Sequence, residues 1–436
     1  MYLADRTRPD PGPAASPALA APSGGGTGRA GRARVGSTVV LLGTVSLLTD
    51  ISSEAVSAVL PLYLTAVVGL SPLAYGVVDG LYQGVSALVR LAGGWLSDRA
   101  DRPKWVAVAG YGLSAAAKVV LLVAQGLLSV AAVISVDRLG KGLRTAPRDA
   151  LIAASSVPAS LGHAFGVHRA MDTTGAALGP LLAFGILWLV PGDYSAVFVA
   201  SLAAAALGVA VLVLLVPDLR PRRLAATTSR GTTPRGAEVS LRLLREGRFG
   251  RVVLAAGVLG LLTVSDGFLY LSLQHRDDFA AMWFPLLFVG TNVSYLALSV
   301  PLGRLSDRVG RAPVLVGGHL LLVAAYLCAA GPLAGLPSTV ACLLLLGAFY
   351  AATDGVLAAL ASSLAPPAVR ASGIATAQTV VAVARFGSSV GFGLLWVWLG
   401  RGPAVLVVAA ALTAAVPLAW WLLRAVETDT PGRVSS

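Results

Sequence analysis

Charged residues are scarce in this sequence. Asp, Glu, Lys and Arg make up 12% of the 436 residues, whereas apolar residues make up 56%. Soluble globular proteins carry about twice that share of charge. The apolar residues form long unbroken runs rather than the alternating short segments of a transmembrane barrel. The sequence therefore predicts an all-α integral membrane protein whose first partner is the lipid bilayer.

Cysteine and histidine are also rare. The two cysteines, Cys328 and Cys342, lie inside apolar runs, and the four histidines have no metal-ligand spacing to cysteine or to each other. This pattern excludes a disulfide framework and favours small buried side chains. No Ser–His–Asp set or phosphate-binding loop is placed to act. We expect no metal, no cofactor and no enzyme activity.

The N-terminal region lacks the apolar segment of a cleavable signal peptide. Residues 1–36 are rich in Pro, Ala and Gly, a composition that cannot bury a core, so we expect a disordered tail. The next residues begin the first of twelve apolar runs long enough to cross a bilayer. These runs are 39–66, 73–97, 104–126, 129–146, 162–190, 194–216, 249–274, 280–303, 312–331, 338–362, 372–398 and 403–424.

An arginine-rich gap divides the runs into six and six. The predicted organisation is a six-helix bundle over 37–216, a central loop over 217–248, a second six-helix bundle over 249–425 and a tail over 426–436. We expect a monomer in the cell membrane, that is, the plasma or inner membrane.

Acidic residues are outnumbered, which gives a net charge of +12. In a soluble protein this would suggest nucleic-acid binding. Here the cations gather in the tails, the central loop and the loops after the second and eighth runs, while the alternate loops offer only Arg276 and Arg401. Such asymmetry indicates retention on the cytoplasmic side. We therefore expect both termini in the cytoplasm and no nucleic-acid partner.

One charged loop occurs twice. Residues 94–104 read Gly-Trp-Leu-Ser-Asp-Arg-Ala-Asp-Arg-Pro-Lys, and residues 303–313 read Gly-Arg-Leu-Ser-Asp-Arg-Val-Gly-Arg-Ala-Pro. Other acids repeat at nearly the same offset, Asp50 with Asp266 and Asp137 with Asp354. The sequence therefore predicts two halves that arose by duplication.

Twelve runs in two halves, with this loop after the second and eighth, resemble the major facilitator superfamily of secondary transporters over nearly all of residues 37–425. Two further motifs resemble those of particular members. Arg138-Leu139-Gly140-Lys141-Gly142 is similar to the Arg-x-x-x-Gly motif of proton-coupled members. Gly175, Gly179 and Pro180 match the Gly-x-x-x-Gly-Pro motif of antiporters. The resemblance implies alternating access, and the pattern is most similar to proton-coupled drug or metabolite antiporters.

The same resemblance assigns the repeated loop a role as a conformational latch on the cytoplasmic side. Its glycines would admit a neighbouring helix, and its acids would meet a helix N-terminus or an arginine. The first copy has Asp101 where the second has Gly310, and we expect Asp to keep the turn because it tolerates left-handed backbone. The alternative is loop charge that only sets topology. The latch residues are Gly94, Asp98, Arg99, Arg102, Gly303, Asp307, Arg308, Gly310 and Arg311.

Several acids lie inside the predicted spans, where each would cost about 2.5–3.5 kcal/mol if it faced lipid. In the run 129–146, Asp137, Lys141 and Arg144 fall with the following Arg148 on one stripe about 60° wide, and Arg138 lies beside it. We expect this stripe to border a central aqueous cavity, with Pro147 ending or kinking the helix. The alternative is a static ion-pair network.

The remaining candidates for proton coupling or the substrate cavity follow the same logic. Two of them share a helix face one turn apart, where neighbouring carboxylates in low dielectric can carry a proton. Three are spaced so that an acid can pair with His or Arg on its own helix, and three in the second half need partners on other helices. They are Asp50 and Glu54, then His168, Arg169 and Asp172, then Asp266, Asp354 and Arg385. The first half is the expected seat of coupling.

The sequence thus predicts proton-coupled efflux of a small molecule. Two alternatives remain open, proton-coupled uptake of an organic anion and a non-transporting sensor or lipid-handling scaffold on the same fold. The helix rotations that would show which side chains line the cavity are not readable from the sequence, so the solute stays unidentified.

Overall fold

A computed structural model describes residues 36–100, 102–157, 160–219, 244, 247–366 and 370–427. The predicted tails over 1–36 and 426–436 and the central loop over 217–248 lie almost wholly outside the described residues. Every regular element in the described ranges is helical.

Six long helices form the first half of the chain. Each begins within a few residues of the start of its apolar run. They are α1 (Ser37–Leu62, continued by the π turn η1, Tyr63–Val67), α2 (Pro72–Ala100), α3 (Pro103–Leu121), α4 (Gly126–Ala154), α5 (Leu161–Leu189) and α6 (Tyr194–Leu214).

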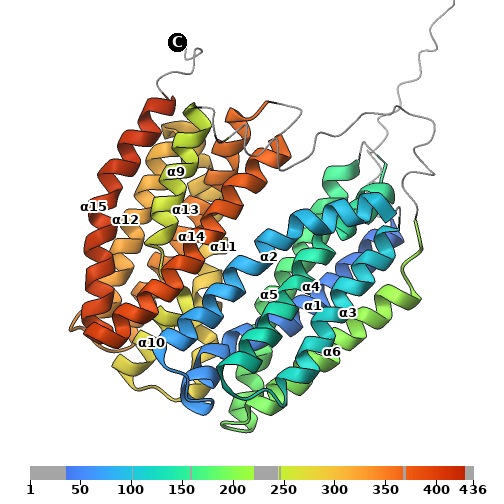
Figure 1. The fold of residues 1–436 in the computed structure, drawn as a ribbon, viewed down its shortest axis with the longest axis horizontal. Coiled ribbons are helices and arrows are strands. Elements are labelled where there is room, and N and C mark those ends of the chain that lie inside the picture. The colour runs from blue at the N-terminus through green and yellow to red at the C-terminus, as the bar shows by residue number, and fades with distance from the viewer. Residues whose placement is uncertain are drawn as a thin grey trace, which may run out of the picture. The chain divides into compact units, whose positions relative to one another are not determined.

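The second half also has six spans, but its first span is interrupted and consists of two helices, α9 and α10. Its elements are α9 (Gly247–Leu261), α10 (Asp266–Asp277), the 3-10 turn η3 (Ala281–Trp283), α11 (Phe284–Val309), α12 (Arg311–Ala330), α13 (Leu336–Leu364), α14 (Arg370–Leu399) and α15 (Arg401–Glu427). Figure 1 shows α1 to α6 grouped together and α9 to α15 grouped together.

The described elements amount to twelve membrane crossings, which confirms the predicted fold class. Ten of the crossings are long and apolar enough to be recognised by length and composition alone. The other two, α2 and α4, have 29 residues each and are long enough, but they carry the intramembrane charges discussed below. Because twelve is even, the start of α1 and the end of α15 lie on the same side of the membrane.

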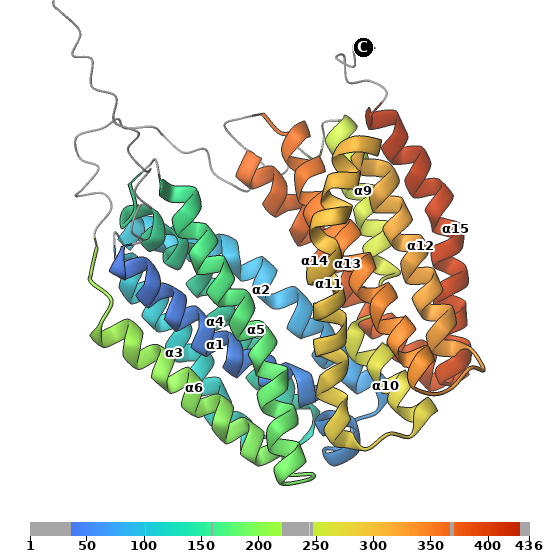
Figure 2. The ribbon, with the colours of Figure 1, turned by 180° about the vertical axis from the view of Figure 1, so that it is seen from behind.

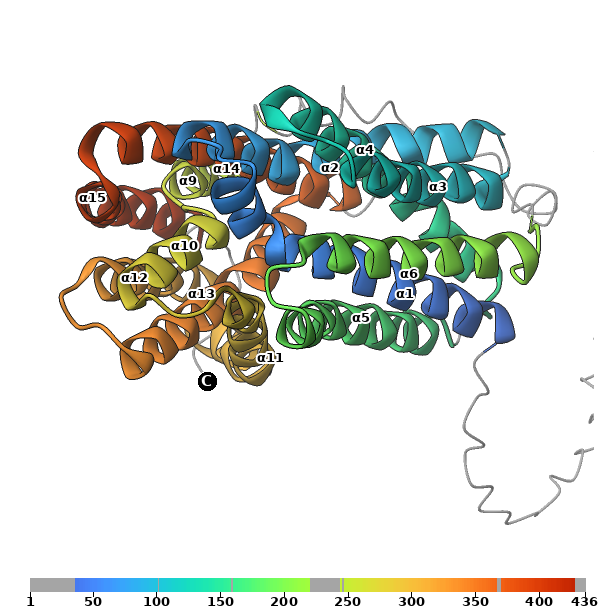
Figure 3. The same ribbon diagram turned by 90° about the horizontal axis from the view of Figure 1, so that it is seen from below.

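The halves meet mainly along two helix pairs, α2 with α14 and α5 with α11. Figures 2 and 3 show α11 beside α5 from two directions. The α2–α14 contact is backbone-close, since a methyl group added at Gly80 would lie 3.1 Å from the carbonyl oxygen of Phe386, and one at Gly393 would lie 2.6 Å from that of Pro72. Glycine therefore allows the two helices to touch.

The break between α9 and α10 corrects the prediction of one continuous helix over 249–274. Residues 262–265 leave the helix, and side chains from two neighbouring helices satisfy the freed backbone. The Tyr326 hydroxyl accepts from Val264 N–H at 2.7 Å and donates to the Leu262 carbonyl at 3.1 Å, and Ser388 Oγ donates to the Thr263 carbonyl at 2.9 Å. Such breaks persist inside membranes only where protein groups replace water.

The sequence predicts that Pro147 either ends or kinks this helix, and the course of α4 shows that Pro147 does not end it. The helix continues to Ala154 with Pro147 inside it. The extension begins with Arg148 and Asp149, which pair at 3.0 Å, and continues through apolar residues that include the buried Leu151 and Ile152. The two charged residues interrupt the apolar run, so the run alone does not show that the helix continues.

Candidate functional site: a charge network beside a central cavity

The innermost charged cluster of the first half centres on Asp137 of α4. Its carboxylate accepts from Lys118 Nζ of α3 at 3.2 Å and from Arg138 Nε at 2.9 Å. The Arg138 guanidinium lies 3.9 Å from the ring centroid of Tyr82 on α2. All three charged side chains are buried, so each depends on the others for compensation.

The next two cations along α4 reach α1. Lys141 Nζ lies 3.8 Å from Glu54, and Arg144 lies 3.9 Å from Asp50. Arg144 also covers the ring of Tyr111 at 4.4 Å. The paired acids on one face of α1 thus face the paired cations on one face of α4.

The network ends at α5. Arg148 lies 3.5 Å from Asp172 and donates to Ser46 Oγ at 3.2 Å, and Ser46 shares a second hydrogen bond of 3.0 Å with His168 Nε2. Arg169 lies 3.4 Å from Asp172, as the i, i+3 spacing predicts. His168 is bonded to Ser46 instead of Asp172.

Two acids of this network come from helices that pack closely along their length, Asp50 from α1 and Asp172 from α5. Their side chains interact with each other. The pair is flanked by Arg144 on one side and Arg148 on the other.

The sequence predicts that the α4 stripe borders a central aqueous cavity, and in this structure the stripe is absent from the lining of the three cavities described below. Its charges turn toward α1, α3 and α5, because those helices carry the opposite charges. The lining of the large cavities described below includes none of Asp50, Asp137, Arg138, Lys141, Arg144, His168 and Asp172.

Three adjoining cavities lie between the halves. A large cavity of about 480 Å³ shares Arg169, Tyr295 and Asp354 with a second of about 320 Å³. The second shares Asp266, Phe288 and Asn292 with a third of about 210 Å³. Glu54, Arg169, Asp266, Asp354 and Arg385 are the predicted site residues that line them. We call the first cavity the basic cavity and the third the acidic cavity.

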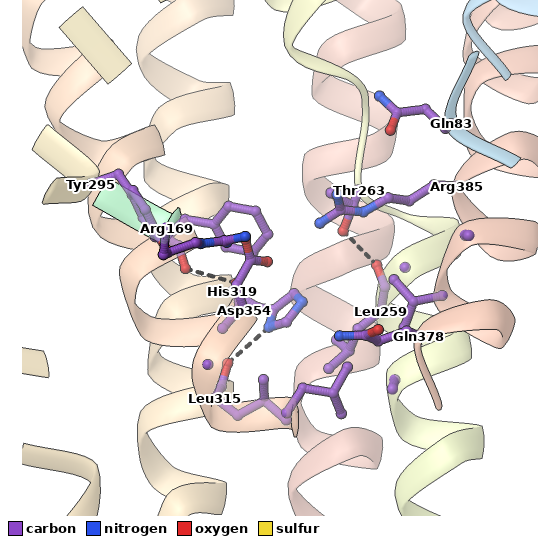
Figure 4. Close-up of a pocket in the computed structure, with 18 residues that line it drawn as sticks. Gln83, Arg169, Leu259, Thr263, Tyr295, Leu315, His319, Asp354, Gln378 and Arg385 are labelled. Atoms are coloured by element: carbon purple, nitrogen blue, oxygen red, sulfur yellow. Dashed lines mark hydrogen bonds between the residues drawn. The ribbon is translucent and has the colours of Figure 1, made fainter. Parts of the chain in front are cut away.

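The basic cavity holds two cations from different halves. Figure 4 shows Arg169 of α5 and Arg385 of α14 pointing into it from opposite sides. The side chain of Arg169 is 77% exposed. Asp354, which lines the same cavity, is also exposed. Arg385 lies 5.7 Å from the ring of Tyr350, and its buried Nε has no hydrogen-bond partner among the described residues.

The acidic cavity is lined by Glu54, Asp79 and Asp266. Asp266 begins α10 and accepts from the Tyr350 hydroxyl at 2.8 Å. Asp79 of α2 accepts from Ser389 Oγ of α14 at 2.5 Å, a hydrogen bond between the halves. Its described lining includes no lysine or arginine.

Sequence reasoning missed the uncharged polar residues of the cavities. Gln83, Asn292 and Gln378 stand in otherwise apolar stretches, and an amide in such a run is a signal that could have found them. Tyr295 and Tyr350 gave no signal, because an aromatic residue in a membrane helix is as often packing as binding.

The antiporter-like motif on α5 has a packing role. Methyl groups added at Gly175 and Gly179 would meet backbone atoms of α1, and the one at Gly179 would lie 2.8 Å from both Ala55 N and the Ile51 carbonyl oxygen. Pro180 lies within the same helix. The motif thus holds Asp50 and Glu54 against α5.

The repeated loop is described mainly in its second copy. The surroundings of Gly94 and the side chains of Asp98 and Arg99 lie outside what the structure describes, and Arg102 is exposed. Asp307 and Arg308 are exposed, and Arg311 donates to the Ala359 carbonyl at 2.9 Å. A methyl group at Gly303 would meet no atom within 4 Å, so the prediction that this glycine admits a neighbouring helix does not hold in this structure.

Gly310 does have a conformational reason. Its backbone angles are φ 108° and ψ 156°, a region that only glycine adopts readily. This differs from the left-handed region that Asp tolerates, so the expected equivalence of Asp101 and Gly310 does not follow. Asp101 itself lies outside the described residues.

Gly310→Ala should therefore lower stability by about 1–3 kcal/mol, because a side chain strains this backbone. Thermal unfolding in detergent measures the change. Gly303→Ala is the matched control on the same loop and should be nearly neutral, since its methyl group meets open space. Equal effects of the two substitutions would contradict the strain argument.

The described residues contain no group of three or more His, Cys, Asp and Glu side chains placed to hold a metal ion. Both cysteines are free, and Cys328 donates to the Ser338 carbonyl at 3.2 Å. The ion pairs and cavities above are therefore the chemistry that the described residues offer.

Comparisons with known proteins agree with the fold. The profile of the Major Facilitator Superfamily matches residues 42–291 and 277–435. An uncharacterized MFS-type transporter of Methanocaldococcus jannaschii is 30% identical over 363 residues, which cover 82% of this chain and 88% of that protein. An uncharacterized protein of Mycobacterium tuberculosis is 31% identical over 180 residues, 39% of this chain and 44% of that protein. The structure of the nucleoside transporter NupG superposes with a TM-score of 0.75 at 14% identity, covering 89% of this chain and 99% of that one.

Proposed function

Since the chain belongs to the major facilitator superfamily, and is therefore a multi-pass secondary transporter of small solutes rather than an enzyme, we propose that it exports its solute in exchange for protons. The observation that carries this proposal is the pair of acids from neighbouring helices, Asp50 and Asp172, each beside an arginine of α4 at 3.9 Å and 3.5 Å. Membership in a transporter family also favours transport over the sensor or scaffold alternative.

The carboxyl pair has the features of a proton site. Two neighbouring acids in a low-dielectric site can share one proton, and the pair can release it to leave two carboxylates beside Arg144 and Arg148. Both arginines lie close enough to stabilise the deprotonated state. The site can therefore alternate between two charge states without leaving either one uncompensated.

Helix α1 connects this proton site to the cavity. Asp50 and Glu54 are one turn apart on the same helix face, and Glu54 lines the acidic cavity while it pairs with Lys141. A change of charge at Asp50 alters its attraction to Arg144 on α4, and the shift of α1 against α4 moves Glu54 as well. Occupancy of the cavity is coupled to protonation by this rigid link.

We further propose that both termini are cytoplasmic and that the protein works as a monomer in the cell membrane. The arginines and lysines of the repeated loops, tails and central loop support the orientation. Under that orientation the α2–α14 seam, which joins the start of α2 to the end of α14, lies toward the outer side.

The test begins with a growth screen of a deletion strain against a panel of toxic compounds and metabolites, which identifies the solute. That solute is then added to everted membrane vesicles with an acidic interior and an internal pH dye. Export appears as solute accumulation with a rise of internal pH. Accumulation with a fall of internal pH would instead establish proton-coupled uptake, the alternative that the two cavity arginines favour.

Asp50→Asn and Asp172→Asn should each lower gradient-driven exchange by about 5- to 150-fold, the usual range of coupling between two sites. Solute binding without a gradient should persist, because neither residue lines a cavity. Asp278→Asn is the matched control, since Asp278 is an exposed acid whose left-handed backbone suits Asn. Unchanged pH dependence in both test variants would exclude the pair as the proton site.

A further inference from the structure

The three joined cavities separate charge by sign. The basic cavity presents Arg169 and Arg385 against one acid, Asp354. The acidic cavity presents three carboxylates and, among its described lining residues, no lysine or arginine. A solute that fills both cavities meets positive charge at one end and negative charge at the other.

The basic end is not satisfied by the protein alone. The buried Nε of Arg385 lacks an acceptor among the described residues, and buried donors without partners are rare in folded proteins. Arg169 contributes a highly exposed guanidinium from the opposite half. Guanidinium groups bind carboxylate or phosphate oxygens in pairs, so an anionic group between these two side chains would complete the hydrogen bonding.

The acidic end has a second feature that favours a cation. Besides Glu54, Asp79 and Asp266, its walls include the aromatic rings of Tyr75, Tyr82 and Phe288. Aromatic faces attract ammonium groups through the ring quadrupole, and nearby carboxylates add to this attraction. The combination of carboxylates and rings suits an amine better than a hydroxyl or an apolar group.

We propose that the transported solute is a small dipolar ion, with its anionic group between Arg169 and Arg385 and its cationic group among Glu54, Asp79 and Asp266. Cavities of about 480, 320 and 210 Å³ give room for a molecule of amino-acid to dipeptide size. This inference rests on the proposed transport function but not on the direction of transport or on proton coupling.

The experiment is equilibrium binding to the purified full-length protein in lipid nanodiscs at pH 7. The probes are L-phenylalanine and L-alanyl-L-phenylalanine, each compared with its N-acetyl form, which is an anion only, and its C-terminal amide, which is a cation only. In at least one set, the dipolar form should bind about tenfold or more tighter than both singly charged forms, since each lost contact removes about 1.4 kcal/mol.

Two variants assign the ends. Arg385→Gln should remove the preference over the amide and keep the preference over the N-acetyl form, whereas Asp266→Asn should do the reverse. Arg304→Gln is the control, because Arg304 is exposed and lines none of the three cavities.

The proposal is overturned if in both sets an N-acetyl or amide form binds as tightly as its dipolar parent, or if neither dipolar probe binds at about 10 mM, which corresponds to a binding free energy of only about 2.7 kcal/mol. If the dipolar probe keeps its binding preference while Asp50→Asn leaves the pH dependence of transport unchanged, proton coupling alone is contradicted. The two hypotheses can therefore fail separately.

Discussion

Asp137→Asn should prevent stable folding. The substitution removes the only acid of the buried cluster described around Lys118 and Arg138 and leaves two cations side by side in the membrane. Breaking a buried ion pair from one side costs about 3–5 kcal/mol, a large part of the 5–15 kcal/mol that stabilises a typical protein. The expected result is low yield in the membrane fraction and aggregation on solubilisation, measured by fluorescence-detection chromatography.

The neighbouring substitution Lys118→Met is the informative control. It removes a cation of similar length and leaves Asp137 paired with Arg138, so the remaining cluster is electrically neutral. Replacing a buried charge with a well-packed apolar side chain is often neutral or stabilising. If Lys118→Met were as harmful as Asp137→Asn, volume rather than charge would control this cluster.

Gly179→Ala should damage transport strongly. Its added carbon would lie 2.8 Å from the backbone of α1 at Ile51 and Ala55, and backbone cannot rotate away. Overpacking of this kind costs about 1–3 kcal/mol. The displaced α1 also shifts Asp50 and Glu54 relative to their partners on α4, so transport should fall even in molecules that fold.

Gly185→Ala on the same helix separates packing from helix propensity. A methyl group there meets no atom within 4 Å, and Ala is the better helix former, so the variant should be neutral or slightly more stable. Transport assays at equal protein level, with thermal unfolding beside them, compare the two. If Gly179→Ala retained full transport, the α1–α5 contact would have to accommodate the added methyl group, which would contradict the packing prediction.

The fold class was predictable because the length of an apolar run determines whether it crosses a bilayer. The superfamily was predictable for a different reason, since the twin loops are rare outside it, and the family match confirms that prediction. The break at residues 262–265 was not foreseen, although Ser265 followed by Asp266 is a common start for a helix. The hydropathy averaged over the whole run 249–274 stays high, so it does not reveal such a break.

The partners of the membrane charges were only partly predictable. Arg169 and Asp172 share a helix, so their spacing sufficed. The pairing of Lys141 with Glu54 depends on how α4 is rotated against α1, and no single helix contains that information. The cavity lining depends on rotation for the same reason, which is why Tyr295 and Gln378 were missed.

Two adjacent serines on α14 connect the break between α9 and α10 in the second half with α2 in the first half. Ser388 holds the unwound carbonyl of Thr263, while Ser389 donates to Asp79 across the seam. Any motion that separates α2 from α14 must first break the bond to Asp79, and a hydrogen bond to a charged group contributes about 1.5–3 kcal/mol. If that bond is intact before the motion and lost at its barrier, it slows opening by roughly 10- to 150-fold. Ser389 would then limit the rate at which α2 separates from α14 in each transport cycle, and Ser389→Ala would increase that rate.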